Sequence, residues 1–304
     1  MSYPEFREEL FCALKSMIPE DVTIELLQVE KLNSCIRHGI SFTKEGEFYS
    51  PTIYLEPFYH NFQNGKSIDF LARELFQCYQ DETRQIPECI HKMESFECAK
   101  EAIFAKIIHV KENHRLLEDT PYLGFLDFAV VPYFEVNSEQ IYKGSVLLKK
   151  YHTDFWKVSD EELLAWAIAH TKEVKGVLFR PMSEVLADYI SEEDGEVFER
   201  AKDGMFVLTN TDKYFGAGVI YYPEVQGMIA EHLQEDYYLL PASVHEWVVV
   251  PESQVVDREL LFAMVRDIND SEVMEEEVLS YNIYFFSRKS QKIHIYESSK
   301  IKIY

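Results

Sequence analysis

Strand-like segments follow one another in groups along this chain, and this order constrains the fold more than any other feature. Extended patterns over 22–30 and 34–42 are consecutive, and residues 205–222, 237–253 and 281–298 form a second group. A doubly wound parallel sheet requires strands that alternate with helices, whereas grouped strands favour an α+β fold. We therefore expect an α+β protein, helix-rich toward its N-terminus, whose C-terminal part is a mostly antiparallel sheet with packed helices.

Helices are predicted from capping residues that precede apolar positions at helical spacing. Ser2, Ser67, Ser159 and Asp257 each stand immediately before such a stripe. Similar but weaker patterns predict helices over 88–106, 181–190 and 223–233. Two hairpins are expected as well, one over 205–222 that turns at 210–213 and one over 281–298, and the terminal "KIKIY" alternates like a strand.

A polar stretch at 111–124, interrupted by Pro121 and Gly124, is the best candidate for a domain boundary. We place a soft boundary there, which gives a helix-rich part over 1–120 and a sheet-rich part over 121–304. A single composite domain is the alternative.

Acidic charge is concentrated in one third of the chain. The net charge is −23, and residues 181–280 hold 23 Asp and Glu against five Lys and Arg, a local balance of −18. Such a region repels phosphate backbones and anionic lipid, so direct nucleic-acid binding and membrane binding are not expected. It either docks a protein with a basic surface or is a solvated acidic face. The candidate contact residues are Glu192, Glu193, Asp194, Glu196, Glu275, Glu276 and Glu277.

The stretch "PASVHE" (241–246) raises the possibility of catalysis, because it places a hydroxyl, an imidazole and a carboxylate within four residues. Ser243 and His245 share one face of an extended strand, so they could act as nucleophile and base, with Asp127 supplied by the fold as the third member. No nucleophile elbow surrounds Ser243. The alternative is an ordinary turn in which Ser243 bonds to the backbone. Asp127 interrupts an apolar strand, so its carboxylate either faces solvent, which is the commoner case, or is buried with a partner.

Metal and cofactor patterns are not found in the sequence. The five cysteines contain no CxxC pair and all precede residue 100, which favours reduced thiols in a cytoplasm over a disulfide framework. Gly216 and Gly218 lie within the expected 205–222 hairpin, not in a phosphate-binding strand-to-helix turn. The first residues lack a basic stretch followed by an apolar core, so we expect no secretory signal, and no apolar run is long enough for a membrane span.

Six blocks occur in an order that resembles an uncharacterised family, a domain of unknown function common in gut-dwelling Gram-positive bacteria. They include "SPTIYLEPFYHNFQNG", "GSVLLKKYHTDFWKVSDEELLAWAIAHT", "LLPASVHEWVVVP" and "VLSYNIYFF". The resemblance covers nearly the whole chain. It implies a cytoplasmic bacterial protein and supplies no catalytic residue, metal or cofactor.

The sequence therefore favours a cytoplasmic interaction protein without chemistry of its own, which binds a basic macromolecular partner through its acidic region. A nucleic-acid mimic that inhibits a nucleic-acid-handling protein is the sharper form of this hypothesis. A hydrolase using Ser243 and His245, and a sensor with an aromatic-lined ligand pocket, are the alternatives. Oligomeric state is not determined by the sequence.

Overall fold

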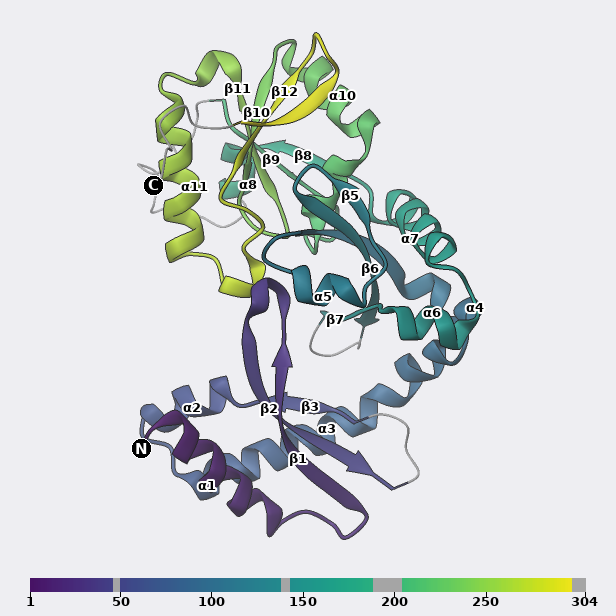
Figure 1. Ribbon diagram of the computed structural model, residues 1–304. Helices are drawn as coiled ribbons and strands as arrows, with labels where there is room; N and C mark the ends of the chain where they lie inside the picture. Colours follow the sequence, from purple (N-terminus) through teal and green to yellow (C-terminus); the bar gives the residue numbers. More distant parts are fainter. Residues whose placement is uncertain (46–49, 138–142, 188–203, 297–304) are drawn as a thin grey trace. The chain divides into compact units, whose positions relative to one another are not determined.

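The computed structural model describes residues 1–45, 50–137, 143–187 and 204–296, with side chains at 82–90, 137 and 143 left undescribed. It divides the chain into two compact units (Figure 1). Unit 1 comprises Met1–Ala99 and Val136–Gly144, and unit 2 comprises Lys100–Glu135 and Ser145–Tyr304. Both combine helices with antiparallel strands, which confirms the α+β class.

The division falls at residues 99 and 100, ahead of the boundary placed near residue 120. Residues 103–109 form a strand that pairs antiparallel with 128–134, and this pairing ties 100–120 to unit 2. The predicted helix over 88–106 is therefore wrong at its C-terminal end. "IFAKIIH" is buried on both faces, and an unbroken apolar run has no periodicity that separates a strand from a helix.

Unit 1 is a three-stranded antiparallel sheet packed against helices, in strand order β1-β2-β3. Its elements are α1 (Tyr3–Lys15), β1 (Val22–Glu30), β2 (Ile36–Lys44), β3 (Thr52–Tyr54), α2 (Glu56–Gln63), α3 (Ile68–His91) and α4 (Phe96–Ala99). Ser2 and Glu5 form the expected capping box at the start of α1. The apolar stripe of α1 (Phe6, Leu10 and Leu14) is completely buried in the core with residues of α3 and β2, so periodicity and core agree.

The described residues of unit 2 form two sheets. The first consists of β4 (Ile103–His109), β5 (Leu123–Phe125), β6 (Phe128–Asn137) and β7 (Lys143–Leu147), with β6 paired to the other three. The second has the order β13-β12-β10-β11-β9-β8, and all its described pairs are antiparallel. Its strands are β8 (Leu178–Pro181), β9 (Phe206–Thr209), β10 (Tyr237–Pro241), β11 (Trp247–Pro251), β12 (Ile283–Ser287) and β13 (Lys292–Tyr296). The hairpin expected over 281–298 is present as β12 and β13.

Helices pack on both faces of this second sheet. The described helices of unit 2 are α5 (His114–Glu118), α6 (Lys150–Trp156), α7 (Asp160–Lys175), α8 (Met182–Ala187), α10 (Pro223–Leu233) and α11 (Arg258–Ser271). One face of β10 and β11 packs on α11 through Leu261 and Val265. On the opposite face, Tyr237 donates a hydrogen bond to the Gln226 carbonyl oxygen of α10. Both faces are buried, so β10 and β11 are continuous apolar runs in the sequence.

The predicted hairpin over 205–222 is wrong. Within it, only Phe206–Thr209 form a strand (β9), and Gly216–Tyr221 form the short 3₁₀ helix η5. A Cβ atom on Gly216 would lie 2.0 Å from Thr209 Oγ1 and 2.7 Å from the His245 carbonyl oxygen. Because glycine has no Cβ atom, the backbone at Gly216 can approach the end of β9 and the His245 carbonyl more closely than any other residue would allow. The terminal "KIKIY" and residues 188–190 of the predicted 181–190 helix lie outside the described residues.

Candidate functional site

The turn that joins β10 to β11 contains Ser243 and His245. Ser243 Oγ accepts a hydrogen bond of 3.0 Å from the backbone N–H of His245. The backbone N–H groups of Ala242 and Ser243 both donate to the carbonyl oxygen of Glu246. The serine hydroxyl thus stabilises its own turn, which is the local bonding that the non-catalytic interpretation predicts.

The His245 imidazole is held by two groups other than Ser243. Nδ1 accepts a hydrogen bond of 3.0 Å from the backbone N–H of Phe215, and Nε2 lies 3.4 Å from Glu277 Oε1. The ring also stacks on Tyr214 and Phe215. Because an accepting Nδ1 leaves the proton on Nε2, the neutral imidazole donates to Glu277. The residues brought together are therefore His245 and Glu277, one a candidate base and the other a candidate partner-binding residue.

Asp127 belongs to a different cluster, between the two sheets of unit 2. It lies in the turn between β5 and β6, where it accepts hydrogen bonds from Asn282 Nδ2 (2.8 Å) and Tyr284 Oη (2.9 Å). His109 Nε2 lies 3.4 Å from the carboxylate. Burial tends to raise the pKa of Asp127, but the hydrogen bonds from His109, Asn282 and Tyr284 outweigh it and lower the pKa. Of the two arrangements considered for Asp127, the structure has the less common one, because the carboxylate is partnered and its side chain is only 18% exposed.

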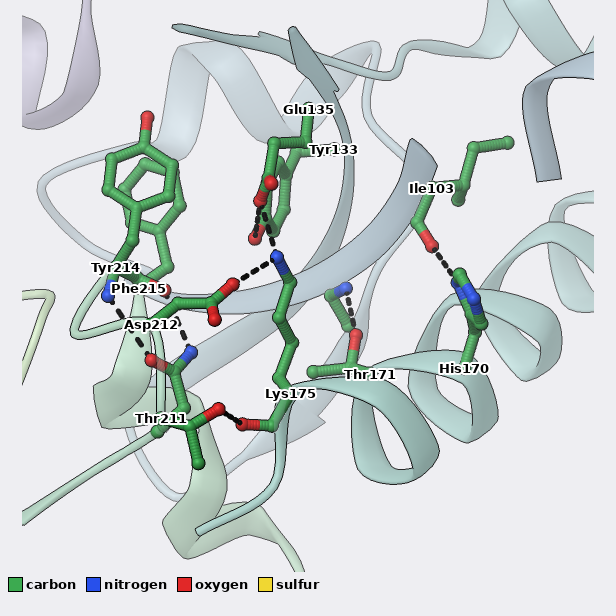
Figure 2. A network of polar contacts seen from close by, with 12 residues as sticks. Ile103, Tyr133, Glu135, His170, Thr171, Lys175, Thr211, Asp212, Tyr214 and Phe215 are labelled. Atoms are coloured by element: carbon green, nitrogen blue, oxygen red, sulfur yellow. Dashed lines mark hydrogen bonds and ion pairs between the residues drawn. The ribbon is translucent and has the colours of Figure 1, made fainter. Parts of the chain in front are cut away.

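A third cluster was not anticipated from the sequence and centres on Lys175, the last residue of α7 (Figure 2). Its Nζ lies 2.7 Å from Glu135 Oε2 of β6 and 2.6 Å from Asp212 Oδ2. The side chains of Lys175 and Glu135 are only 4% and 3% exposed, whereas that of Asp212 is 34% exposed. Lys175 Nζ also sits 4.0 Å from the centre of the Phe104 ring.

The surroundings of Lys175 extend this network of charges. Tyr133 donates a hydrogen bond of 3.4 Å to Glu135, and its pKa is raised by burial and by the nearby Glu135 charge. The Lys175 carbonyl oxygen accepts from Thr211 Oγ1 (Figure 2). The cluster therefore fastens the end of α7 to β6 and to the 210–215 loop. A lysine in the last turn of a helix is normally solvated and interacts with the helix dipole. The position of Lys175 in the sequence therefore does not indicate that its ammonium group is buried.

An acidic face, defined here as the carboxylates of residues 257–277, occupies α11 and the segment after it. Its members are Asp257, Glu259, Asp267, Asp270, Glu272, Glu275, Glu276 and Glu277, against two arginines in the same range. Asp267, Asp270, Glu272 and Glu275 are exposed, and Glu276 and Glu277 are half-buried. Tyr281 donates to Asp270, and Asp257 caps α11. The predicted residues Glu192, Glu193, Asp194 and Glu196 lie outside the described residues.

Apolar side chains are exposed beside these carboxylates. Val256 is 98% exposed, Leu260 58% and Met274 54%. Val256 precedes the N-cap Asp257 of α11, and Leu260 lies in the first turn of that helix. Met274 precedes the three consecutive glutamates. Exposed apolar groups surrounded by charge are typical of protein-interaction surfaces.

Several other carboxylates of the 181–280 region are paired within the chain. Asp212 bonds Lys175, Glu224 pairs with Lys172, and Glu252 pairs with Arg258. Carboxylates of this region therefore differ in exposure and in partners. Exposed ones occur in the acidic face, where Asp270 and Glu277 also have partners within the chain.

Comparison with known proteins gives the chain a family. The model of a family of unknown function (DUF5688) matches residues 3–288. The chain belongs to this family. No curated protein and no solved structure gives a significant match.

The described residues lack two features that mark other functional classes. No group of three or more His, Cys, Asp or Glu side chains there has the arrangement of a metal site. Among the same residues, no helix is both long and apolar enough to cross a membrane.

Proposed function

We propose that this protein binds a macromolecular partner with a basic surface, and that the acidic face of residues 257–277 is the docking site. One observation carries the proposal. Exposed carboxylates and exposed apolar side chains occur together on α11 and the segment that follows it. Carboxylates guide a basic partner and suppress acidic ones, while Leu260 and Met274 supply the desolvated contact that charge alone does not.

The outward surface of α11 explains why this face is available. Leu261 and Val265 point into the core, so Leu260, Asp267 and Asp270 are directed away from the sheet. Each exposed ion pair contributes about 0.2–1 kcal/mol to binding. Three such pairs together contribute about 1.4 kcal/mol, which corresponds to a roughly tenfold change in Kd. A nucleic-acid mimic is a special case of this function, in which the basic partner is itself a nucleic-acid-binding protein.

The test uses two variants with equal changes in net charge. One replaces Asp267, Asp270 and Glu272 with their amides, and the control replaces Glu8, Glu9 and Glu20, which are exposed in unit 1, with glutamine. Proteins that the unmodified chain captures from a lysate of its own cells are identified. Each purified partner is then titrated against the unmodified chain, the acidic-face variant and the control variant. We expect a basic partner whose Kd rises about tenfold with the first variant and remains unchanged with the control.

Salt provides a second measurement. The Debye length falls from about 10 Å at 0.1 M to about 3 Å at 1 M, so binding should weaken steeply across this range. Partners that are not basic, or that bind all three proteins equally at every salt concentration, would show that the acidic face is not the docking site.

A further inference from the structure

Strand β13 lies at one edge of the six-stranded sheet (Figure 1). One side of β13 pairs with β12 over the full length Lys292–Tyr296, and no other described strand pairs with its opposite side. An edge of this kind presents a row of backbone N–H and C=O groups to a further strand. The other edge strand, β8, has only four residues and ends at Pro181, which donates no backbone hydrogen bond.

The β13 edge is basic, although the chain as a whole is acidic. Residues 281–296 contain Arg288, Lys289, Lys292 and His294 and no Asp or Glu. The side chains of Lys289, Lys292 and His294 are exposed. These positive charges lie on a chain whose net charge is −23.

The positive charge lies toward the turn of the hairpin. At the opposite end of β13, Arg258 from the start of α11 lies 3.4 Å from Tyr296 Oη, and the acidic face begins there. Near the turn, the Arg288 backbone N–H donates to Asp236 Oδ1, so one carboxylate is already engaged with the hairpin. The segment from Lys289 to His294 is therefore the part of the edge that favours an anionic neighbour.

We infer that β13 is a docking edge for an extended acidic peptide of a partner protein, which adds to the sheet as a further antiparallel or parallel strand. Backbone hydrogen bonds would supply affinity, and carboxylates beside Lys289, Lys292 and His294 would supply specificity. The exposed Ile295 side chain offers an apolar contact on the same strand. This surface is distinct from the acidic face, and the inference does not rest on the proposed function.

Charge also argues against two other occupants. Pairing of β13 with β13 of a second copy would bring two basic edges together, and like charges directly opposite destabilise a pair of strands. The chain's own residues 297–304 contain Lys300 and Lys302 but only one acidic residue, Glu297. Their net positive charge therefore does not complement the basic β13 edge. Lysine on an edge strand opposes these pairings while it leaves an acidic strand permitted.

The experiment uses the full chain and a synthetic peptide of alternating glutamate and threonine. Binding is measured by isothermal titration, and hydrogen exchange of the β13 amides is followed with and without peptide. A peptide of the same sequence N-methylated at alternate residues keeps its charge but loses its backbone donors. We expect binding with slowed exchange in β13, no binding of the methylated peptide, and a Kd about tenfold higher for the Lys289→Glu/Lys292→Glu variant.

A matched variant distinguishes the β13 edge from a general effect of net charge. Lys15→Glu/Lys111→Glu makes the same charge change at exposed positions elsewhere and should bind the peptide like the parent. Equal binding of the methylated peptide, or equal binding of a lysine–threonine peptide, would overturn strand addition. So would a dimer of the chain that protects β13, or faster β13 exchange after removal of residues 297–304 without any peptide.

Discussion

Replacing Lys175 with methionine tests whether the buried network of unit 2 stabilises the fold. Methionine keeps the length and the apolar stem over Phe104 but removes the ammonium group. Glu135, at 3% exposure, then remains buried without this partner, whereas Asp212 is exposed enough to be solvated. Breaking a buried ion pair on one side costs about 3–5 kcal/mol. We expect the lower part of this range, about 3 kcal/mol, because the Tyr133 hydroxyl still donates to Glu135.

The assay is unfolding by urea and, separately, by heat, each monitored by tryptophan fluorescence. All three tryptophans (Trp156, Trp166 and Trp247) lie in unit 2, so the signal reports that unit. For a unit of this size, 1 kcal/mol shifts the melting temperature by about 2–4 °C, and Lys175→Met should therefore lower it by roughly 6–12 °C. Asp212→Asn should cost less than about 1 kcal/mol, because that carboxylate is partly solvated.

A double variant separates the charge effect from lost packing. Adding Glu135→Gln to Lys175→Met removes the unpaired charge, so the double variant should be more stable than Lys175→Met alone. The coupling free energy should be about 1–3 kcal/mol. A loss below about 1 kcal/mol for Lys175→Met, or strictly additive losses in the double variant, would refute the reasoning.

Two further predictions concern the turn glycine and the Asp127 cluster. Gly216→Ala should destabilise unit 2 by about 3 kcal/mol or more, because the added Cβ would overlap Thr209. In the control variant Gly227→Ala, the added Cβ in α10 meets no atom within 4 Å, so this variant should be more stable by about 0.5–1 kcal/mol. Equal unfolding midpoints would contradict this. The lowered pKa of Asp127 means that its ionised form favours the folded state, so this stability is complete above the ordinary pKa and is lost as pH falls through the folded value. Asp127→Asn should therefore destabilise at neutral pH and progressively less in acid, and a penalty independent of pH would exclude the charge as its cause.

Where side-chain pattern and local chemistry agree, the sequence was sufficient to predict structure. The helix expected over 223–233 is α10, with Pro223 at its first position, and α7 begins where Ser159 accepts a hydrogen bond from the Glu162 backbone N–H. Capping and helical periodicity depend on residues within one or two turns, so no distant part of the fold is needed to recognise them. The acidic character of residues 257–277 also follows from the sequence alone, since charge is a property of composition, and their role in docking is a proposal.

Tertiary structure alone decided which side chains meet. His245 and Glu277 are 32 residues apart, Lys175 and Asp212 are 37 apart, and Asp127 and Tyr284 are 157 apart. A lysine at the end of a helix or an aspartate in a strand has the same local sequence signature whether it is solvated or buried. Strand pairing that places β4 beside β6, and the close approach at Gly216, set these environments. They depend on contacts across the whole of unit 2, because burial and charge pairing are properties of packed neighbours and not of adjacent residues in the chain.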